Sequence, residues 1–195
     1  MQVVAFLPGF VALFALLSTV PNWFGALVGT LVGALIQLVY PLTGKLTGAT
    51  PTLLPGWGWV LLGIFAFHGV AEELVWRGYA YRRLREGRTF WRAVLLTMPL
   101  IAATHIPIVI GSGPAVGAAA MVVAAVTSIP LAHLFEMGRD TIWAPAVLHT
   151  AIDTFKLFTL PDAVFPLLLA GVSVVVPLLV LLAGRPGRSA RPAAA

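Results

Sequence analysis

Long apolar stretches, separated by short loops rich in proline, glycine or arginine, divide most of this 195-residue chain. A stretch of about 20 apolar residues is long enough to cross a bilayer as a helix. About seven stretches approach this length, at roughly 3–20, 23–42, 57–85, 90–110, 114–135, 142–158 and 162–183. We therefore expect an all-α fold, a polytopic membrane helix bundle of about seven transmembrane helices with the active site inside the bundle.

The composition agrees with a membrane protein. Hydrophobic residues make up 59% of the chain and charged residues only 10%, whereas a soluble domain has about 25% charged residues. The sequence pI is near 10.5, but the arginines gather in the predicted loops, where we expect them to face anionic lipid and not nucleic acid. The chain has no cysteine, which excludes disulfides, a cysteine nucleophile and cysteine-ligated metal.

The positions of the arginines predict the orientation of the helices. An even number of predicted helices separates the loop after the third stretch from the C-terminal end, so the positive-inside rule places both on the cytoplasmic side. We expect one transmembrane domain over residues 1–184, with the motif-bearing core at about 56–158, and a disordered basic tail over 185–195. The arginines that define the two regions are Arg82, Arg83, Arg85, Arg88 and Arg92, and Arg185, Arg188 and Arg191.

Two adjacent carboxylates, Glu72 and Glu73, interrupt the third apolar stretch in a chain that has only seven acidic residues. Charged side chains at membrane depth are energetically expensive and by default mark function. Arg77 lies four residues after Glu73, and His68 lies four residues before Glu72; side chains at this spacing share a face of a helix. We expect a structural ion pair between Glu73 and Arg77, which leaves Glu72 free for chemistry with His68 close to it.

The other three histidines also fall within apolar stretches. Asp153 lies four residues after His149 and so shares its helix face. Counting about 1.5 Å per residue from the charged loops, Glu72, His105 and His149 lie at depths of about 14–20 Å, where they can meet. A carboxylate, two histidines and an aspartate at one depth indicate an acid/base site, whereas we interpret His133 as a packed, structural histidine.

The order of these residues resembles the CPBP family, the CAAX-protease and bacteriocin-processing (Abi) membrane proteins, which includes the Rce1-type prenyl-protein proteases. The resemblance covers about residues 56–158 and rests on three motifs. These are EExxxR, present as Glu72-Glu73-x-x-x-Arg77, FxxxH, which ends at His105, and HxxxN/D, present as His149-x-x-x-Asp153.

Two positions depart from the usual motifs. Ile101 stands where the second motif usually has phenylalanine, at a packing position. Asp153 stands where the third motif more often has asparagine. An asparagine can donate a hydrogen bond to an oxyanion, whereas an ionised aspartate cannot, so Asp153 is either an oxyanion partner or a residue that only orients His149.

The resemblance implies an intramembrane endopeptidase. Glu72, together with His105, would activate a water molecule to attack a peptide carbonyl. His149, together with Asp153, would stabilise the oxyanion if His149 can donate a hydrogen bond. Glu73 would hold the shape of the site with its arginine.

The family has been described both as metalloprotease-like and as glutamate-dependent. A glutamate and two histidines can bind zinc and leave one position open for water, and here that set would be Glu72, His105 and His149. No histidine lies in an HExxH helix, so we favour the glutamate mechanism without a cofactor and keep zinc as the alternative.

The expected substrate is a membrane-associated peptide, or a protein with a C-terminal or transmembrane segment. The candidates are a prenylated CAAX protein, a bacteriocin, a signalling peptide and a C-terminal sorting tail. The compact chain, biased toward arginine, alanine, glycine and proline, is typical of bacteria, so we expect it in a bacterial inner membrane. Two other functions stay open: a non-catalytic membrane partner that confers immunity or binds peptides, and a small proton-coupled transporter, although the paired broken helices of many transporters are missing from the sequence.

Overall fold

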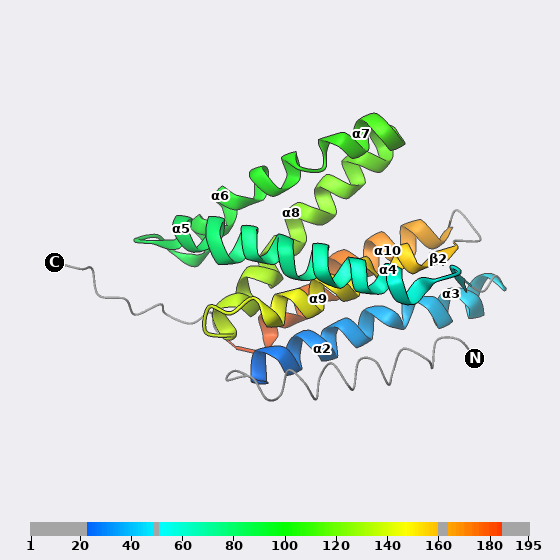
Figure 1. The fold of residues 1–195 in the computed structure, drawn as a ribbon, viewed down its shortest axis with the longest axis horizontal. Helices are drawn as coiled ribbons and strands as arrows, with labels where there is room; N and C mark the ends of the chain where they lie inside the picture. The colour runs from blue at the N-terminus through cyan, green and yellow to red at the C-terminus, as the bar shows by residue number, and fades with distance from the viewer. Residues whose placement is uncertain (1–22, 49–50, 160–163, 185–195) are drawn as a thin grey trace.

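The structure is a computed structural model that describes residues 23–48, 51–159 and 164–184. These ranges are helical apart from one short two-stranded ladder, which confirms the all-α class (Figure 1). Within these ranges four helices are long and apolar enough to cross a membrane, so the chain is an integral membrane protein; they are Phe24–Thr47, Trp57–Arg85, Phe90–Ser112 and Pro114–Met137. The expected number of about seven is not reached within the described ranges, and the expected first helix and basic tail lie outside them.

The first long helix consists of α2 (Trp23–Gln37) and α3 (Val39–Thr47). It ends at Gly48, whose φ of 72° lies in the left-handed region that glycine adopts without strain. The helix therefore runs about one turn beyond the predicted end at residue 42. The short strand β1 (Thr52–Leu53) follows and pairs antiparallel with β2 (Phe158–Thr159).

The second long helix carries the two carboxylates. It is built from α4 (Trp57–Ile64), η2 (Phe65–Ala71), η3 (Leu74–Tyr81) and α5 (Arg82–Arg85). Both η2 and η3 are π-helical, and wide turns of this kind occur frequently at functional sites. Glu72 and Glu73 lie between the two π-helical segments, so the backbone is widened on both sides of the carboxylate pair.

A break at a histidine separates the next two helices. After α6 (Phe90–Ala103) the chain turns through Thr104 and His105 into α7 (Ile106–Ser112). Pro107 lies in the first turn of α7, where its missing N–H would have no helical partner in any case. Gly113, with φ 89°, then reverses the chain into α8 (Pro114–Met137). Figure 1 shows α6, α7 and the first half of α8 diverging from the other helices.

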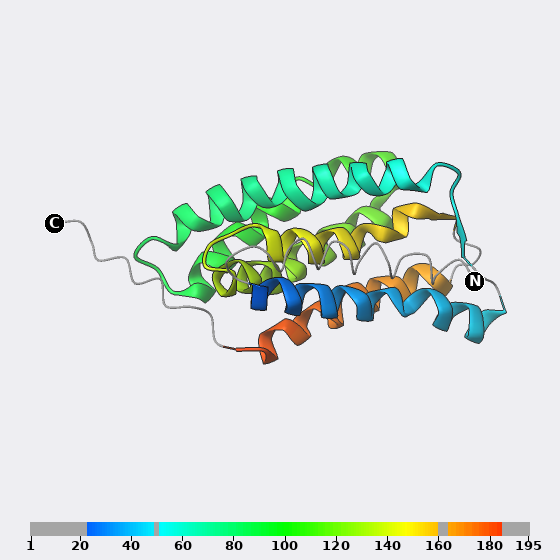
Figure 2. The same cartoon turned by 60° about the horizontal axis from the view of Figure 1, so that its bottom comes forward.

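The last two predicted spans are shorter than a bilayer requires. The stretch at 142–158 forms α9 (Trp143–Asp153), the 3-10 turn η4 (Thr154–Leu157) and β2. The final stretch forms α10 (Val164–Val175) and η5 (Pro177–Leu182). Nearly all of α9 is buried, because α2, α8 and η2 surround it, as Figures 1 and 2 show. A helix inside the bundle contacts protein on every side and does not need the length of a lipid-facing span.

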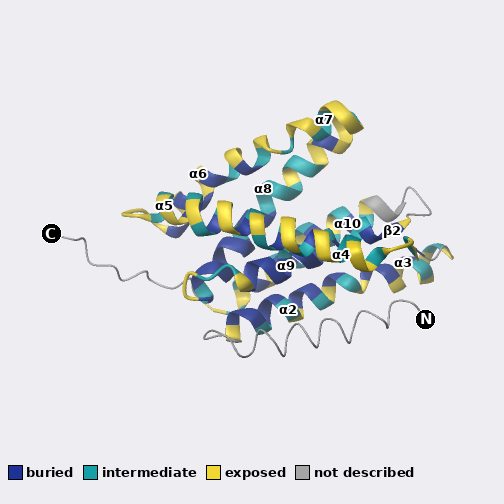
Figure 3. Ribbon diagram, viewed as in Figure 1, coloured by how far each residue is buried: buried dark blue, intermediate teal, exposed yellow. Residues whose placement is uncertain are grey.

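Small residues allow the helices to pack closely around α9. A Cβ atom on Gly29 of α2 would lie 2.8 Å from the carbonyl oxygen of Ala144. Close backbone approach of this kind drives helix association in lipid, where the hydrophobic effect contributes little. Figure 3 shows buried residues on α9 and the second half of α8, and exposed residues along α4, α6 and α7. The largest core cluster joins α2, α8, α9 and η5 through Val28, Val32, Ile36, Leu131, Leu134, Ala144, Leu148, Ile152 and Val180.

A buried carboxylate near the end of α8 ties this helix to the one that carries the glutamate pair. Glu136 is only 6% exposed, and its Oε1 accepts hydrogen bonds from Tyr81 Oη at 2.6 Å and from Arg85 Nε at 2.7 Å. No helical spacing predicts this contact, because it joins residues more than fifty positions apart. It fixes η3 and α5 against α8 on one side of the site.

The close approach of η2 to α9 leads to a first prediction. A Cβ atom on Gly69 would lie 3.0 Å from the carbonyl oxygen of Ala146 and would overlap Thr150 Oγ1. Gly69→Ala should lower the free energy of unfolding by about 1–3 kcal/mol, as overpacking does. Gly63→Ala is the matched control, because a Cβ atom at Gly63 meets nothing within 4 Å. Thermal denaturation in detergent measures both variants, and equal melting temperatures would contradict the packing described here.

Candidate active site

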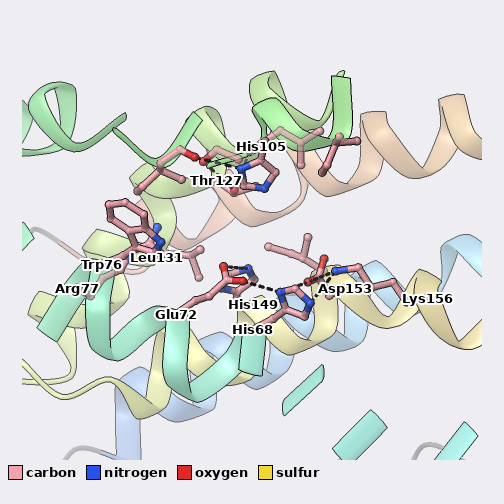
Figure 4. A pocket seen from close by; sticks show the side chains of 15 residues that line it. His68, Glu72, Trp76, Arg77, His105, Thr127, Leu131, His149, Asp153 and Lys156 are labelled. Atoms are coloured by element: carbon pink, nitrogen blue, oxygen red, sulfur yellow. Dashed lines mark hydrogen bonds and ion pairs between the residues drawn. The ribbon is translucent and has the colours of Figure 1, made fainter. Parts of the chain in front are cut away.

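The ionisable residues at the centre of the bundle line a cavity of about 140 Å³. The cavity lies between η2 and η3 on one side, α9 and η4 on a second, and α6, α7 and α8 on the third (Figure 4). All the residues predicted for the site line it except Glu73; they are His68, Glu72, Arg77, His105, His149 and Asp153. The structure thus brings together residues from three separate regions of the sequence.

Glu73 lies behind the cavity wall, with its side chain completely buried. Its Oε1 accepts hydrogen bonds from Arg77 Nη1 at 2.8 Å and from His149 Nδ1 at 2.6 Å. Arg77 is itself only 3% exposed. The predicted ion pair is therefore confirmed, and His149 is an additional partner that the helical spacing could not reveal.

Glu72 points into the cavity instead, with 27% of its side chain exposed. Its Oε1 accepts a hydrogen bond from His68 Nδ1 at 2.7 Å, as the four-residue spacing predicted. Its Oε2 lies 3.9 Å from Nε2 of His149. The two adjacent carboxylates thus approach opposite nitrogens of one imidazole ring, Glu73 from the protein interior and Glu72 from the cavity.

The partner of each His149 nitrogen determines what that nitrogen can do. Oε1 of Glu73 already accepts from Arg77, which can only donate, so Nδ1 of His149 donates to the same oxygen. Neutral His149 then presents a lone pair at Nε2, on the side of Glu72. It can donate a hydrogen bond to a substrate only in its doubly protonated form.

Asp153 contacts His68 and a lysine. Its Oδ2 lies 3.4 Å from His68 Nδ1 and accepts a hydrogen bond from Lys156 Nζ at 2.8 Å. Asp153 was expected to orient His149 or to face the oxyanion. The direct hydrogen bond that orients His149 comes from Glu73 instead, and the ion-pair partners of Asp153 are His68 and Lys156. Lys156 Nζ also lies 3.1 Å from His68 Nε2. Lys156 was not singled out from the sequence, although its three-residue spacing from Asp153 places the two on one helix face.

His105 lies across the cavity from Glu72, at the junction of α6 and α7 (Figure 4). Its Nδ1 donates to the carbonyl oxygen of Ile101 at 3.1 Å, which leaves the lone pair on Nε2. His133 is outside the cavity, 1% exposed and packed edge-on against the ring of Phe90. The interpretation of His133 as a buried, packed residue is confirmed.

Three of these side chains come close enough to be tested as a metal site. Donor atoms of His68, Glu72 and His149 lie within 4.8 Å of one another. This set has His68 where the zinc site predicted from the sequence has His105. The hydrogen bonds do not fit a metal at all three donors. Nε2 of His68 accepts from an ammonium group and its Nδ1–H faces Glu72, so the lone pair that a metal requires is already in use.

Comparison with known proteins identifies the family of this chain. The profile of the Rce1-like family, described as type II CAAX prenyl endopeptidase Rce1-like, matches residues 54–155. This segment is just over half of the 195-residue chain and includes every motif described above. No curated protein and no solved structure matches the chain. The chain belongs to the Rce1-like family of type II CAAX prenyl endopeptidases, a family of intramembrane proteases.

Proposed function

We propose that this protein is an intramembrane endopeptidase that hydrolyses a peptide bond in a membrane-associated peptide or in the C-terminal segment of a membrane-associated protein. The observation that carries the proposal is the position of Glu72. Its carboxylate faces the cavity, 3.9 Å from a histidine nitrogen that has a lone pair, while the neighbouring Glu73 is buried and already paired. Family membership supports a peptide as the substrate.

In this mechanism Glu72 acts as the general base. His68 donates to its Oε1, which leaves Oε2 to take a proton from a water molecule in the cavity. The water donates its second hydrogen to the Nε2 lone pair of His105, which orients it, while Nε2 of His149 lies 3.9 Å from Oε2 of the base. The water oxygen bonds to the peptide carbonyl carbon, and the π electrons of the carbonyl move to its oxygen. The C–N bond then breaks, and the proton held by Glu72 passes to the departing amine.

The walls of the cavity suit an apolar peptide. Apart from the ionisable residues, most of the side chains that face the cavity are aliphatic, and they come from α6, α7, α8 and α9. An extended peptide with aliphatic side chains can pack against such walls while its scissile carbonyl lies next to Glu72. The aliphatic residues are Ile101, Ile108, Val123, Ala124, Leu131 and Ile152.

The first test is substitution of the base. Full-length protein in liposomes is incubated with a peptide that ends in an S-farnesylated CAAX sequence, with its unprenylated form and with a hydrophobic transmembrane peptide, and products are identified by mass spectrometry. Glu72→Gln should lower kcat by about 10²–10⁴, because an amide cannot accept the proton. His105→Ala should also lower kcat. Full turnover by Glu72→Gln contradicts the mechanism, and a wild type that cleaves none of the peptides contradicts the function.

The division of roles between the two glutamates gives a second test. Glu73→Gln leaves the charge of Arg77 without a counterion in the interior, and removing one partner of a buried pair destabilises by about 3–5 kcal/mol. We expect a lower melting temperature for Glu73→Gln than for Glu72→Gln. Glu86→Gln is the control, because Glu86 forms an exposed pair with Arg83, and such pairs contribute less than about 1 kcal/mol. The reverse order of stabilities would exchange the roles of the two glutamates.

A metal-independent reaction is the third expectation. The lone pair of His68 accepts from Lys156, and His105 is not among the donor atoms of the described residues that lie within 4.8 Å of one another. Peptide hydrolysis should therefore continue at an unchanged rate after dialysis against a strong zinc chelator. Elemental analysis of the same sample should show less than one zinc per chain. Loss of activity on chelation, restored by stoichiometric zinc, would establish the metal mechanism instead.

A further inference from the structure

In their neutral forms, the histidines of the cavity leave the oxyanion of the proposed reaction without a donor. An oxyanion intermediate needs N–H or O–H groups aimed at the developing charge, and a neutral histidine has a single N–H. In the structure each of these hydrogens already has an acceptor. His68 donates to Glu72, His105 to the carbonyl oxygen of Ile101, and His149 to Glu73.

In the described residues, the ammonium group of Lys156 has more N–H donors than hydrogen-bond partners, and its Nζ also lies 5.5 Å from the centroid of the Phe155 ring. Its ammonium group carries three N–H donors, and within the described part of the chain it has two hydrogen-bond partners, Asp153 Oδ2 at 2.8 Å and His68 Nε2 at 3.1 Å. The side chain lines the cavity and is 36% exposed. Figure 4 shows Lys156 extending from the chain toward Asp153 and His68.

The geometry places Lys156 and the proposed base on either side of one imidazole ring. His68 contacts Glu72 through Nδ1 and Lys156 through Nε2. A peptide carbonyl beside this ring can turn its carbon toward the water at Glu72 and its oxygen toward Lys156. Asp153 holds the ammonium group in place through an ion pair of 2.8 Å.

We propose that Lys156 is a catalytic residue that donates a hydrogen bond to the oxyanion of the tetrahedral intermediate. The proposal rests on the endopeptidase function above and adds an electrophilic residue to it. Water attack converts the carbonyl π electrons into the oxyanion charge, which the third N–H of Lys156 meets. When the C–N bond breaks, the carbonyl re-forms and the lysine is released unchanged.

Two other cavity residues carry N–H groups. Arg77 is only 3% exposed and donates to the buried Glu73, so Trp76 is the donor that must be considered. Trp76 lines the cavity on the opposite side of Glu72 from Lys156 in Figure 4. An indole N–H is neutral, whereas hydrogen bonds from an ionised donor are roughly twice as strong. Trp76→Phe tests this alternative donor, and Lys45→Met, which removes an exposed lysine of α3, is the matched control.

Steady-state kinetics on the peptide that the wild type cleaves fastest test the proposal. Lys156→Met should lower kcat by about 10²–10³ with little change in KM, as loss of one oxyanion donor does. Lys156→Arg should retain more of kcat than Lys156→Met, Trp76→Phe should lower kcat less than Lys156→Met, and Lys45→Met should leave kcat unchanged. An unchanged kcat for Lys156→Met overturns the proposal, as does a loss confined to Trp76→Phe. A rise in KM alone that disappears with a C-terminally amidated peptide also overturns it, because Lys156 would then bind the carboxylate of the substrate.

A second pair of variants, made in the Asp153→Asn protein, distinguishes loss of the donor from loss of stability. Lys156→Met leaves Asp153 without its cation, so the substitution is repeated together with Asp153→Asn, which removes the unpaired charge and supplies an amide donor. In this background Lys156→Met should reduce kcat by a smaller factor than in the wild type. Equal factors in the two backgrounds, with unchanged melting temperatures, contradict a donor role.

A binding measurement separates failure of this proposal from failure of the proposed function. A phosphinic peptide imitates the anionic tetrahedral intermediate, and its parent peptide has a planar, uncharged carbonyl. The wild type should bind the phosphinic peptide more tightly, and Lys156→Met should lose that preference while Trp76→Phe keeps it. If the wild type cleaves nothing, the endopeptidase function fails and the catalytic role of Lys156 fails with it, and this comparison then shows only whether Lys156 binds an anionic tetrahedral group. If the wild type shows no preference for the phosphinic peptide, the proposal for Lys156 fails.

Discussion

The buried carboxylate of Glu73 is the group on which the rest of the site depends. An ionised side chain in an apolar interior must be compensated by charge and hydrogen bonds, and Glu73 obtains both from two different elements, Arg77 on its own helix and His149 on α9. These bonds fix the rotation of the long helix and its register against α9. Glu72, the next residue along the chain, is thereby turned into the cavity, so the structural contact also determines how the chemical group is presented.

The backbone around this contact is arranged so that the two helices can approach. Glycine at position 69 lets η2 lie directly against Ala146 and Thr150 of α9, and π-helical turns precede and follow the glutamate pair. In a membrane, where helices gain little from hydrophobic burial against one another, this close packing and the polar bonds that it permits supply most of the specificity. The break between α6 and α7 serves the same arrangement, because it brings His105 to the opposite wall of the cavity.

The cavity combines a carboxylate with several imidazole lone pairs, a set that suits proton transfer better than stabilisation of a negative charge. The N–H of each neutral cavity histidine already has an acceptor in the protein. These neutral histidines can therefore only accept hydrogen bonds from a ligand in the cavity. In the proposed reaction, the hydrogen-bond donor to the oxyanion must then be another group. Asp153, in place of the usual asparagine, lacks the N–H donors of an amide, and the adjacent Lys156 carries cationic N–H donors in the same region. The lysine can therefore supply the hydrogen bond that the amide would have given.

The sequence by itself determined the membrane class, the positions of the long apolar helices and the pairs separated by one helical turn, His68 with Glu72 and Glu73 with Arg77. These features follow from composition and from the helical repeat, which act along a single segment of chain. Only the tertiary structure decided that His149 binds Glu73 and that it approaches the pair of His68 and Glu72. It also placed His105 across the cavity from them (Figure 4) and Lys156 beside Asp153 at the cavity. Such contacts depend on the rotation and register of one helix against another. The packing of small residues and buried charges sets these quantities, and no periodicity within a segment encodes them.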